Sequence, residues 1–428
     1  MVGNKIMIEN RRGAGTVDRS VYSNVGKKED TTGIARRVAQ ISVSAIKQMP
    51  VLASKIEGCI SLGQGIPSFG TPSFIRESIV AALKHDEFIG KYSLQPGIPE
   101  LKLEIAKYLH RTKGIDVDPE RELFVSCGAM EALAGVISTV VDRGDEVLIP
   151  SPNYSSHIEQ ILFAEGNPVF VPLIEEEGWR LDMAGFRKAL TPKTKAILLC
   201  NPVNPTGAVF REEDLRALAE MALERNLFII SDEAYDFLLY DGLPHFSLAS
   251  IPELKRLLIT CKSFSKMYCM TGWRVGYMVA AARIVDQVLK VHDAFAICAP
   301  TISQYAALAA LKATNGKDGD GDRFIRQLVE ALSSRRDIIC DRLDGLPHLF
   351  SYQRPKGAYY VFPKITHDNE NDMDLALRLL HEARVITIPG SGFGPTGAGH
   401  IRLSFGAPEK DIHRAFDRID EWAHQNFG

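Results

Sequence analysis

A lysine stands in an unusual setting within the stretch SFSKMYCMTGWRVGY, which covers residues 263–277. Lys266 lies there among hydroxyl-bearing and mostly apolar residues, and the nearest charges in the sequence are Lys262 and Arg274, both positive. Cationic neighbours and apolar surroundings favour the neutral form of an amine, which is its nucleophilic form. The stretch therefore predicts a reactive amine that forms a Schiff base with an aldehyde.

Further polar residues follow short apolar runs elsewhere in the chain. Runs such as LFVS, KAILLC, LFIIS and LLITC are typical of strands that are buried on both faces of a parallel sheet. Ligands bind beyond the carboxyl ends of such strands, so the residues that follow them are expected at one common site. These residues are Gly128, Ala129 and Met130 after LFVS, Asn204 after KAILLC, Asp232 and Tyr235 after LFIIS, and Ser263, Ser265 and Lys266 after LLITC.

Pyridoxal phosphate is the common aldehyde cofactor, and it needs three further kinds of group. Its ring nitrogen needs a carboxylate, which Asp232 can supply. Its phenolic oxygen needs hydrogen-bond donors, which Tyr235 and Asn204 can supply. Its phosphate needs an anion cradle. The candidates for this cradle are Gly128, Ala129 and Met130 at a helix N-terminus, together with Ser263, Ser265 and Arg274.

The elements that must position these residues alternate between strand-like and helix-like patterns. This alternation predicts an α/β fold with a mostly parallel sheet. From about residue 306 the pattern changes to long helices and then to the short runs YYVFP, RVITIPG and HIRLSFG, which indicate a smaller α+β domain. We expect a flexible N-terminal extension over 1–35, a large cofactor-binding domain over 70–305, and a small domain formed by 36–69 and 306–428.

The composition excludes several classes of protein. The chain has 428 residues and a net charge of −3, with acidic and basic residues mixed, so no nucleic acid partner is expected. Its seven cysteines are scattered without a C-x-x-C pair, which favours a reducing compartment and no metal site. No secretory signal or membrane-spanning run is evident. We therefore expect a cytoplasmic enzyme with no membrane partner.

From about residue 60 onward the chain resembles the class I aminotransferases of the fold-type I pyridoxal-phosphate family, including the aspartate and aromatic aminotransferases. The motifs that carry the resemblance occur in the family's order: LGQGIPSF, YSLQPGIPEL, SCGAMEAL, PSPNY, NPVNPTG, SDEAYD, SFSKMYCMTGWRVGY and HIRLSFG. The resemblance implies a large domain with a mostly parallel seven-stranded sheet and a smaller α+β domain. It also implies transfer of an amino group from an L-amino acid to a 2-oxo acid, with 2-oxoglutarate as the expected acceptor.

The resemblance also assigns roles around the cofactor. Lys266 would carry the cofactor and move the proton at the substrate Cα, and Asp232 would pair with the ring nitrogen. Tyr235 and Asn204 would bond the phenolic oxygen, and Tyr154 would stack on the ring. The phosphate would be held by Ser263, Arg274 and the groups around Gly128.

Further roles concern the substrate and a second subunit. Arg402 matches the arginine that holds the substrate α-carboxylate, and Gly65 matches a glycine that lies close to it. Tyr92 matches a tyrosine that reaches the phosphate of the other subunit, which implies a homodimer with shared active sites. His157 matches a histidine that supports the aspartate in some members, and a core histidine is the alternative for this residue.

Some alternatives stay open. A pyridoxal-phosphate lyase that eliminates a β-substituent would use the same Lys266 and Asp232. A regulatory module fused to a DNA-binding domain is disfavoured, because the segment before the resemblance is too short for a winged helix. Some aspartate-using relatives carry a lysine where this chain has Met130, which favours apolar or aromatic substrates. The stretch DGDGD, at 318–322, lacks the later glycine and glutamate of a calcium loop and is predicted to be a solvated loop.

Overall fold

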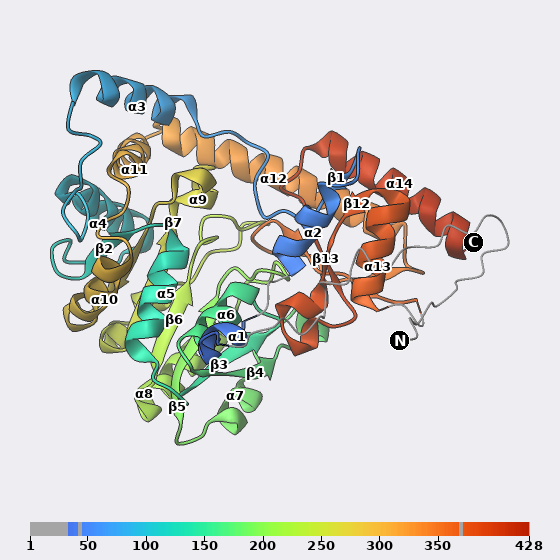
Figure 1. Ribbon diagram of the computed structural model, residues 1–428, viewed down its shortest axis with the longest axis horizontal. Helices are drawn as coiled ribbons and strands as arrows, with labels where there is room; N and C mark the ends of the chain where they lie inside the picture. The colour runs from blue at the N-terminus through green and yellow to red at the C-terminus, as the bar shows by residue number, and fades with distance from the viewer. Residues whose placement is uncertain (1–32, 42–44, 368–370, 428) are drawn as a thin grey trace.

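The computed structural model describes residues 33–41, 45–367 and 371–427, whose arrangement is shown in Figure 1. The predicted N-terminal extension over 1–35 therefore lies almost wholly outside the described residues. None of the helices in the described ranges is long and apolar enough to cross a lipid bilayer.

A seven-stranded sheet lies at the centre of the larger part of the molecule. Its strand order is β2-β8-β7-β6-β5-β3-β4. Strand β8 runs antiparallel to β2 and β7, and the other pairings are parallel, which confirms the predicted mostly parallel sheet. The strands are β2 (Leu123–Ser126), β3 (Glu146–Ser151), β4 (Asn167–Pro172), β5 (Thr194–Cys200), β6 (Phe228–Asp232), β7 (Leu258–Ser263) and β8 (Gly276–Ala280).

Helices cover both faces of this sheet, which explains why its central strands are unbroken apolar runs. On β5, Ala196 and Leu198 belong to a core with residues of α5 and α10, while the alternate residue Ile197 belongs to a core with α8. Strand β4 is only half-buried because it forms the edge of the sheet. The covering helices are α5 (Ala129–Val140), α6 (Ser155–Phe163), α7 (Met183–Ala189), α8 (Glu212–Arg225) and α10 (Ala282–Phe295).

A third group of helices packs beside β2. Helix α11 (Thr301–Ala313) contacts both α3 (Ser73–His85) and α4 (Pro99–Lys113), and apolar side chains of all three share one core with Leu123. The predicted boundary between residues 305 and 306 falls inside α11, so the exact limits of the two domains stay a prediction.

The C-terminal part has the mixed α and β character that the sequence predicts. Strands β10 (Tyr360–Val361), β14 (Ile401–Ser404) and β13 (Ile388–Pro389) form one antiparallel sheet. Strand β1 (Ile60–Ser61) pairs with β12 (Val385–Ile386), so the segment that precedes the large sheet in sequence packs with the C-terminal part. The other elements here are β9 (Phe350–Ser351), β11 (Lys364–Ile365), α12 (Asp320–Asp344), α13 (Asp372–Arg378) and α14 (Glu409–Phe427).

One local prediction was partly wrong. The stretch DGDGD was expected to be a loop, but α12 begins at Asp320 within it. The Asp322 carboxylate accepts hydrogen bonds from the backbone N–H groups of Asn315, Gly316 and Gly319. A carboxylate in the first turn is favoured by the helix dipole, so these aspartates start a helix although their composition is typical of a loop.

Short segments complete the described chain. Helix α2 (Ala45–Ala53) packs Ala45 and Met49 into the core that also contains Leu148 of β3. The remaining segments are α1 (Arg36–Ala39), η2 (Glu175–Glu177), η3 (Leu248–Ser250), η4 (Pro252–Arg256), α9 (Phe264–Met267), η5 (Thr271–Trp273), η6 (Leu379–Ala383), η7 (Gly390–Phe393) and η8 (Pro395–Gly397).

Candidate active site

A cavity of about 440 Å³ lies beyond the carboxyl ends of the central strands. The sheet register explains why polar residues meet there, because Asp232 lies opposite Cys200 of β5 and Cys261 of β7. Of the residues predicted for the site, all except Gly128, Tyr92 and His157 line this cavity: Gly65, Ala129, Met130, Tyr154, Asn204, Asp232, Tyr235, Ser263, Ser265, Lys266, Arg274 and Arg402.

The half-buried Lys266 lines this cavity from the single turn α9. Its Nζ donates a hydrogen bond of 2.7 Å to the backbone oxygen of Gly65. Burial, together with the nearby guanidinium groups of Arg402 and Arg274, lowers the pKa of Lys266 to about 8. A larger fraction of this amine is therefore neutral near neutral pH than for an ordinary lysine, as the sequence predicted.

The prediction that Lys262 is a cationic neighbour of the Lys266 amine was wrong. Lys262 is only four residues before Lys266 in the sequence, but its ammonium is paired with the carboxylates of Glu233 and Asp236. The positive neighbours that lower the pKa of Lys266 are Arg402 and Arg274. Side chains on a strand alternate between faces, and sequence distance does not show which cation shares a cavity with the amine.

Asp232 ends β6, and its carboxylate makes two polar contacts. Its Oδ1 accepts a hydrogen bond of 3.1 Å from the backbone N–H of Ala234. Its Oδ2 lies 3.1 Å from Nε2 of His157, which is fully buried, and Nδ1 of His157 lies 2.8 Å from Oδ1 of Asn153. The histidine is therefore in direct contact with the aspartate, as the supporting role requires.

Arg402 is fully buried on β14 and connects the two parts of the molecule. Its Nη1 donates to Oδ1 of Asn204 at 2.9 Å, and its Nη2 donates to the backbone oxygen of Gly63 at 2.6 Å. The guanidinium lies 4.5 Å from the centre of the Tyr360 ring. Its Nε has no hydrogen-bond partner among the described residues. A buried donor without a partner is costly, and a carboxylate bound in the cavity would satisfy it.

Tyr235 follows Asp232 by three residues and turns its hydroxyl toward the same cavity. The hydroxyl lies 2.8 Å from that of Tyr360, so the two share a hydrogen bond. Burial raises the pKa of Tyr235 well above its ordinary value. The hydroxyl therefore keeps its proton and can donate it to an acceptor in the cavity.

The start of α5 and the turn after α9 form a candidate anion cradle. Gly128 has a φ of +81°, and a Cβ at this position would lie 2.8 Å from Nη2 of Arg274. A Cβ at Gly276 would lie 2.6 Å from the backbone nitrogen of Ala129. These contacts require glycine at both positions. They bring a guanidinium beside the free N–H groups of a helix N-terminus, which is a favourable site for a phosphate.

Taken together, these groups fit pyridoxal phosphate. The cavity contains an amine with a lowered pKa for the aldehyde, a carboxylate for the ring nitrogen and a cradle for the phosphate. Tyr92 does not line the cavity, and its side chain is 78 % exposed, so any contact with a cofactor would need a second copy of the chain.

Sequence reasoning missed several residues of the site. Tyr360 bonds Tyr235 and stacks on Arg402, but paired tyrosines in a strand usually indicate only a core. Ile46 and Pro50 of α2 line the cavity although they precede the recognised motifs. Glu131 accepts a hydrogen bond from the backbone N–H of Cys127 and thereby holds the loop before α5. A glutamate in the first turn of a helix is common, and no pattern marked this one.

Comparison with known proteins gives a consistent result. Residues 57–419 match the family model for aminotransferase class I and II. The chain is 35% identical over 390 residues to aromatic-amino-acid aminotransferase 2 of Thermococcus litoralis, covering 91% of this chain and 97% of the relative. It is 35% identical over 387 residues to aspartate aminotransferase of Pyrococcus abyssi, covering 90% and 97%. The solved structure of Thermus thermophilus aspartate aminotransferase with maleate superposes with a TM-score of 0.85 at 34% identity, covering 91% of this chain and 99% of that one.

Proposed function

Because the chain belongs to the class I and II aminotransferase family, whose members depend on pyridoxal phosphate, we propose that it carries this cofactor on Lys266. It then transfers the amino group of an L-amino acid to a 2-oxo acid. The observation that supports this most strongly is the Lys266 amine, whose pKa is lowered to about 8, in one cavity with Asp232 and Arg402.

The side chains divide the work of holding the cofactor. When bound, pyridoxal phosphate supplies an electron-accepting ring that stabilises negative charge at the substrate Cα. The Asp232 carboxylate, supported by His157, would keep the proton on the ring nitrogen. Tyr235 and Asn204 would donate to the phenolic oxygen, and Tyr154 would cover the ring. The phosphate would be held by Ser263, Ser265, Arg274 and the backbone N–H groups of Ala129 and Met130, because the N–H of Gly128 already donates to the Ser126 oxygen.

Three residues would act on the substrate itself. Arg402 would hold the α-carboxylate through a planar pair of donors, for which its unpartnered Nε is available. Gly65 lies in the lining of the cavity, and a Cβ there would clash with the Tyr360 hydroxyl, so glycine is required at this position. The Lys266 amine would serve as the base that moves the proton of the substrate Cα.

The cavity walls favour amino donors with apolar or aromatic side chains. The lining of the cavity includes the apolar residues Met130 and Leu133 of α5, Ile46 and Pro50 of α2, and Ile66. Among the described residues that line the cavity, the cations are Lys266, Arg274 and Arg402, and each already has a role. We propose 2-oxoglutarate as the acceptor, whose distal carboxylate then requires a cation from outside this set.

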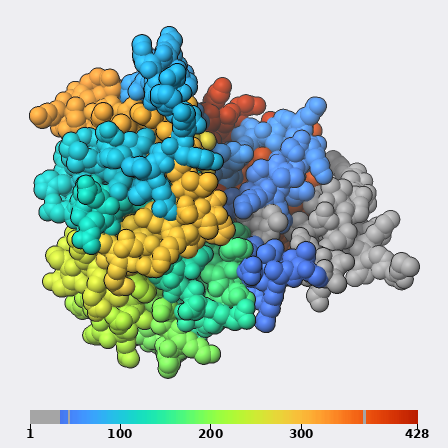
Figure 2. All heavy atoms as spheres, turned by 60° about the vertical axis from the view of Figure 1, so that its left-hand side comes forward, coloured from blue at the N-terminus to red at the C-terminus, as the bar shows by residue number. Residues whose placement is uncertain are grey.

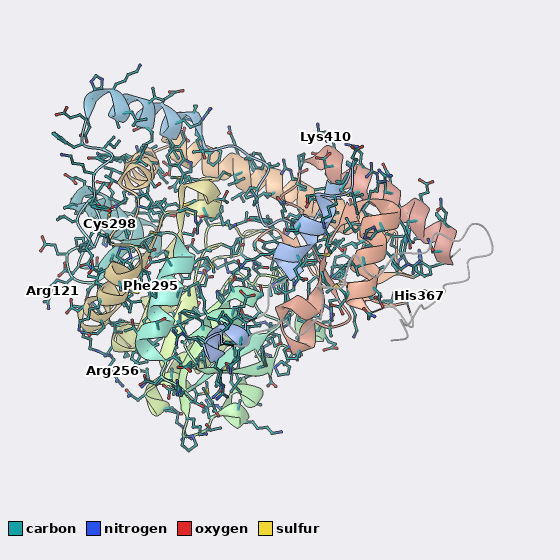
Figure 3. The ribbon with its side chains drawn as sticks, viewed as in Figure 1. Arg121, Arg256, Phe295, Cys298, His367 and Lys410 are labelled. Carbon is teal, nitrogen blue, oxygen red and sulfur yellow. The ribbon has the colours of Figure 1, made fainter. Side chains whose placement is uncertain are left out.

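A homodimer would bring Tyr92 to the second active site. Tyr92 lies on an exposed segment together with the apolar side chains of Phe88 and Leu94, and Phe295 and Ile297 at the end of α10 are exposed as well. Figure 2 turns the side with α3, α4 and α10 toward the viewer, and Figure 3 labels Phe295. Exposed apolar groups of this size are typical of subunit interfaces. The dimer and the cytoplasmic location stay predictions.

Reduction with borohydride tests the cofactor attachment. The protein with bound pyridoxal phosphate is reduced, digested and examined by mass spectrometry, and the adduct is expected on Lys266. Lys262 is the internal control, because it is close in sequence but ion-paired with Glu233 and Asp236. An adduct on any lysine other than Lys266 would overturn the assignment.

A scan of amino donors against 2-oxoglutarate tests the reaction. Phenylalanine, tyrosine and leucine are expected to give higher kcat/KM than aspartate. A preference for aspartate would contradict the apolar pocket. Release of ammonia and a 2-oxo acid from cysteine-type substrates, without any acceptor, would favour the lyase alternative instead.

A further inference from the structure

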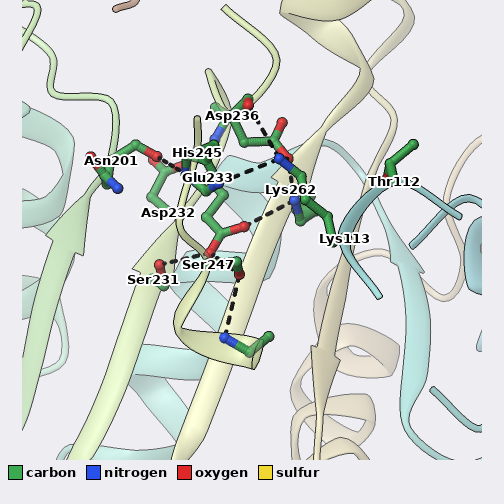
Figure 4. A network of polar contacts seen from close by, with 12 residues as sticks. Thr112, Lys113, Asn201, Ser231, Asp232, Glu233, Asp236, His245, Ser247 and Lys262 are labelled. Carbon is green, nitrogen blue, oxygen red and sulfur yellow. Dashed lines mark hydrogen bonds and ion pairs between the residues drawn. The ribbon is translucent and has the colours of Figure 1, made fainter. Parts of the chain in front are cut away.

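A buried cluster of charged side chains lies beside the active-site edge of the sheet (Figure 4). We call it the ion cluster, and it consists of Lys113, Glu233, Asp236, His245 and Lys262. The Lys262 Nζ lies 2.9 Å from Oε2 of Glu233 and also bonds Oδ2 of Asp236. The Lys113 Nζ lies 3.5 Å from the same Oδ2. Two ammonium groups therefore balance two carboxylates in the interior.

The protonation states of the ion cluster follow from its surroundings. Burial opposes ionisation of Glu233 and Asp236, but Lys262 and the other cations outweigh it, so the pKa of both carboxyls lies below the ordinary value. Burial lowers the pKa of His245. Its Nδ1 lies 3.4 Å from the Lys113 ammonium and its Nε2 lies 3.2 Å from the backbone oxygen of Asn201, so the neutral ring carries its proton on Nε2.

The cluster resembles a metal site in composition. Ligand atoms of Glu233, Asp236 and His245 lie within 4.8 Å of one another. However, the Lys262 ammonium bonds both carboxylates. The cluster therefore already contains its own cation.

The ion cluster joins three chain segments that also carry site residues: some of its members belong to these segments, and His245 contacts one of them. His245 bonds the Asn201 carbonyl, at the beginning of the loop that carries Asn204. Glu233 and Asp236 flank Tyr235 in the segment after β6. Lys262 lies on β7, directly before Ser263 and close to Lys266.

The hydrogen bonds of the sheet do not reach these site residues. Strand β5 ends at Cys200, β6 at Asp232 and β7 at Ser263. Asn204, Tyr235 and Lys266 therefore lie beyond the ends of their strands. Among the described residues, backbone hydrogen bonds link the segments only at the strand ends, from the Asn201 N–H to the Asp232 oxygen and from the Glu233 N–H to the Cys261 oxygen. Contacts between side chains are needed to fix the residues farther along.

We propose that the ion cluster is a positioning device for the active site. It joins the segments after β5, β6 and β7, and so determines where Asn204, Tyr235 and Lys266 stand relative to one another. Ser247 and Ser231 hold the second oxygen of Glu233, at 2.7 Å and 3.4 Å, and keep the cluster in one geometry. The expected effects on cofactor affinity and on reaction rate rest on the proposed function.

The variant Lys262→Met tests this proposal. It keeps most of the side-chain volume but leaves two buried carboxylates with one ammonium. We expect the affinity for pyridoxal phosphate to fall about tenfold or more, and the first half-reaction to slow about 10- to 100-fold, because displacement by about 1 Å costs that much in rate. Three quantities are measured: thermal unfolding of the apoprotein, the dissociation constant of pyridoxal phosphate, and the single-turnover rate with excess amino acid.

A matched control separates positioning from general stability. Arg342 also bridges two carboxylates, those of Asp417 and Asp420, but it does so between α12 and α14. In Arg342→Met the unfolding temperature is expected to fall while the dissociation constant and the single-turnover rate stay within twofold of the wild type. If Lys262→Met behaves in the same way, the ion cluster is only structural and the proposal is overturned.

A second variant separates geometry from net charge. Lys262→Met combined with Asp236→Asn restores the charge balance without restoring the bonds. We expect unfolding temperature to recover in part, while the affinity for pyridoxal phosphate stays low. Full recovery of the affinity would show that the cluster acts through charge alone, which would also overturn the proposal.

His245→Phe tests the contact between His245 and the loop that carries Asn204. This variant also tests the proposal if the lysine variants fail to fold. It removes one hydrogen bond to the Asn201 carbonyl and keeps the ring. Because Asn204 bonds Arg402, the KM for amino acids and 2-oxo acids should rise about tenfold, with little change in cofactor affinity. An unchanged KM would refute the proposal that His245 positions the loop carrying Asn204. Failure of the wild-type protein to bind the cofactor would instead refute the proposed function.

Discussion

Replacing Arg402 by lysine separates recognition of the substrate from the chemistry. The substitution keeps the positive charge but removes the planar fork of the guanidinium, since a lysine ammonium acts as a point charge. In the structure this guanidinium is already oriented by Asn204 at 2.9 Å and by the Gly63 carbonyl at 2.6 Å. Its face is fixed by the rings of Tyr360 and Phe393. The substrate would therefore meet a rigid group in the wild type and a mobile one in the variant.

The magnitude follows from the hydrogen bonds that are lost. A hydrogen bond to a charged group contributes about 1.5–3 kcal/mol. Losing one such bond to the α-carboxylate, at about 1.4 kcal/mol per factor of ten, predicts a fall in kcat/KM of about 10- to 150-fold. A second lost bond would enlarge the fall to several hundredfold or more. The rate of proton removal suffers as well, because a substrate that pivots no longer keeps its Cα–H bond perpendicular to the cofactor ring.

The assay compares several substrates in single-turnover and steady-state kinetics. The fall should be similar for every amino acid and every 2-oxo acid, since all of them carry the same α-carboxylate. Amines without a carboxylate, where they react, should be nearly unaffected and serve as the control. A fall that is confined to one class of side chain would refute the reasoning, because Arg402 would then read the side chain.

Three further predictions concern the cofactor. Asp232→Asn should slow the single-turnover rate by about 10²–10³-fold with the cofactor still bound, because a neutral amide cannot stabilise the ring N–H cation; near-normal turnover would assign the role to another carboxylate. In the apoprotein, attachment of pyridoxal phosphate should accelerate as the pH rises and level off above about 8, because the lowered pKa of Lys266 makes its amine largely neutral there; a rate that still climbs near pH 10 would indicate an ordinary lysine. Tyr92→Phe should weaken cofactor binding about tenfold in a protein that sediments as a dimer, and a fully active monomer would contradict the shared site.

The fold could be predicted largely because its central strands are buried on both faces. Their apolar runs are continuous, and the helices between them show one apolar stripe each, so alternation alone indicates a parallel sheet. The site then followed from one geometric rule, since residues after the carboxyl ends of parallel strands meet at one edge. Asp232, Tyr235 and Lys266 were found in this way.

The contacts between distant segments could not be predicted in the same way. Arg402 lowers the pKa of Lys266 although it lies on β14 of the C-terminal part. Tyr360 meets Tyr235 through the packing of the two parts of the molecule. Neither contact leaves a periodic signal in the sequence, because packing depends on how the elements meet in space. Sequence proximity was misleading for Lys262, which the structure pairs with carboxylates.

Lys262 and Lys266 are only four residues apart, yet their surroundings shift their pKa values in opposite directions. Lys262 is buried and Lys266 is half-buried, and removal from water by itself lowers the pKa of each. For Lys262, the carboxylates of Asp236 and Glu233 outweigh burial and raise its pKa well above the ordinary value. For Lys266, Arg402 and Arg274 act in the same direction as burial, and Asp232 opposes them only in part. The first lysine therefore stays a charged structural cation, and the second reaches its neutral, reactive form at a lower pH than an ordinary lysine does.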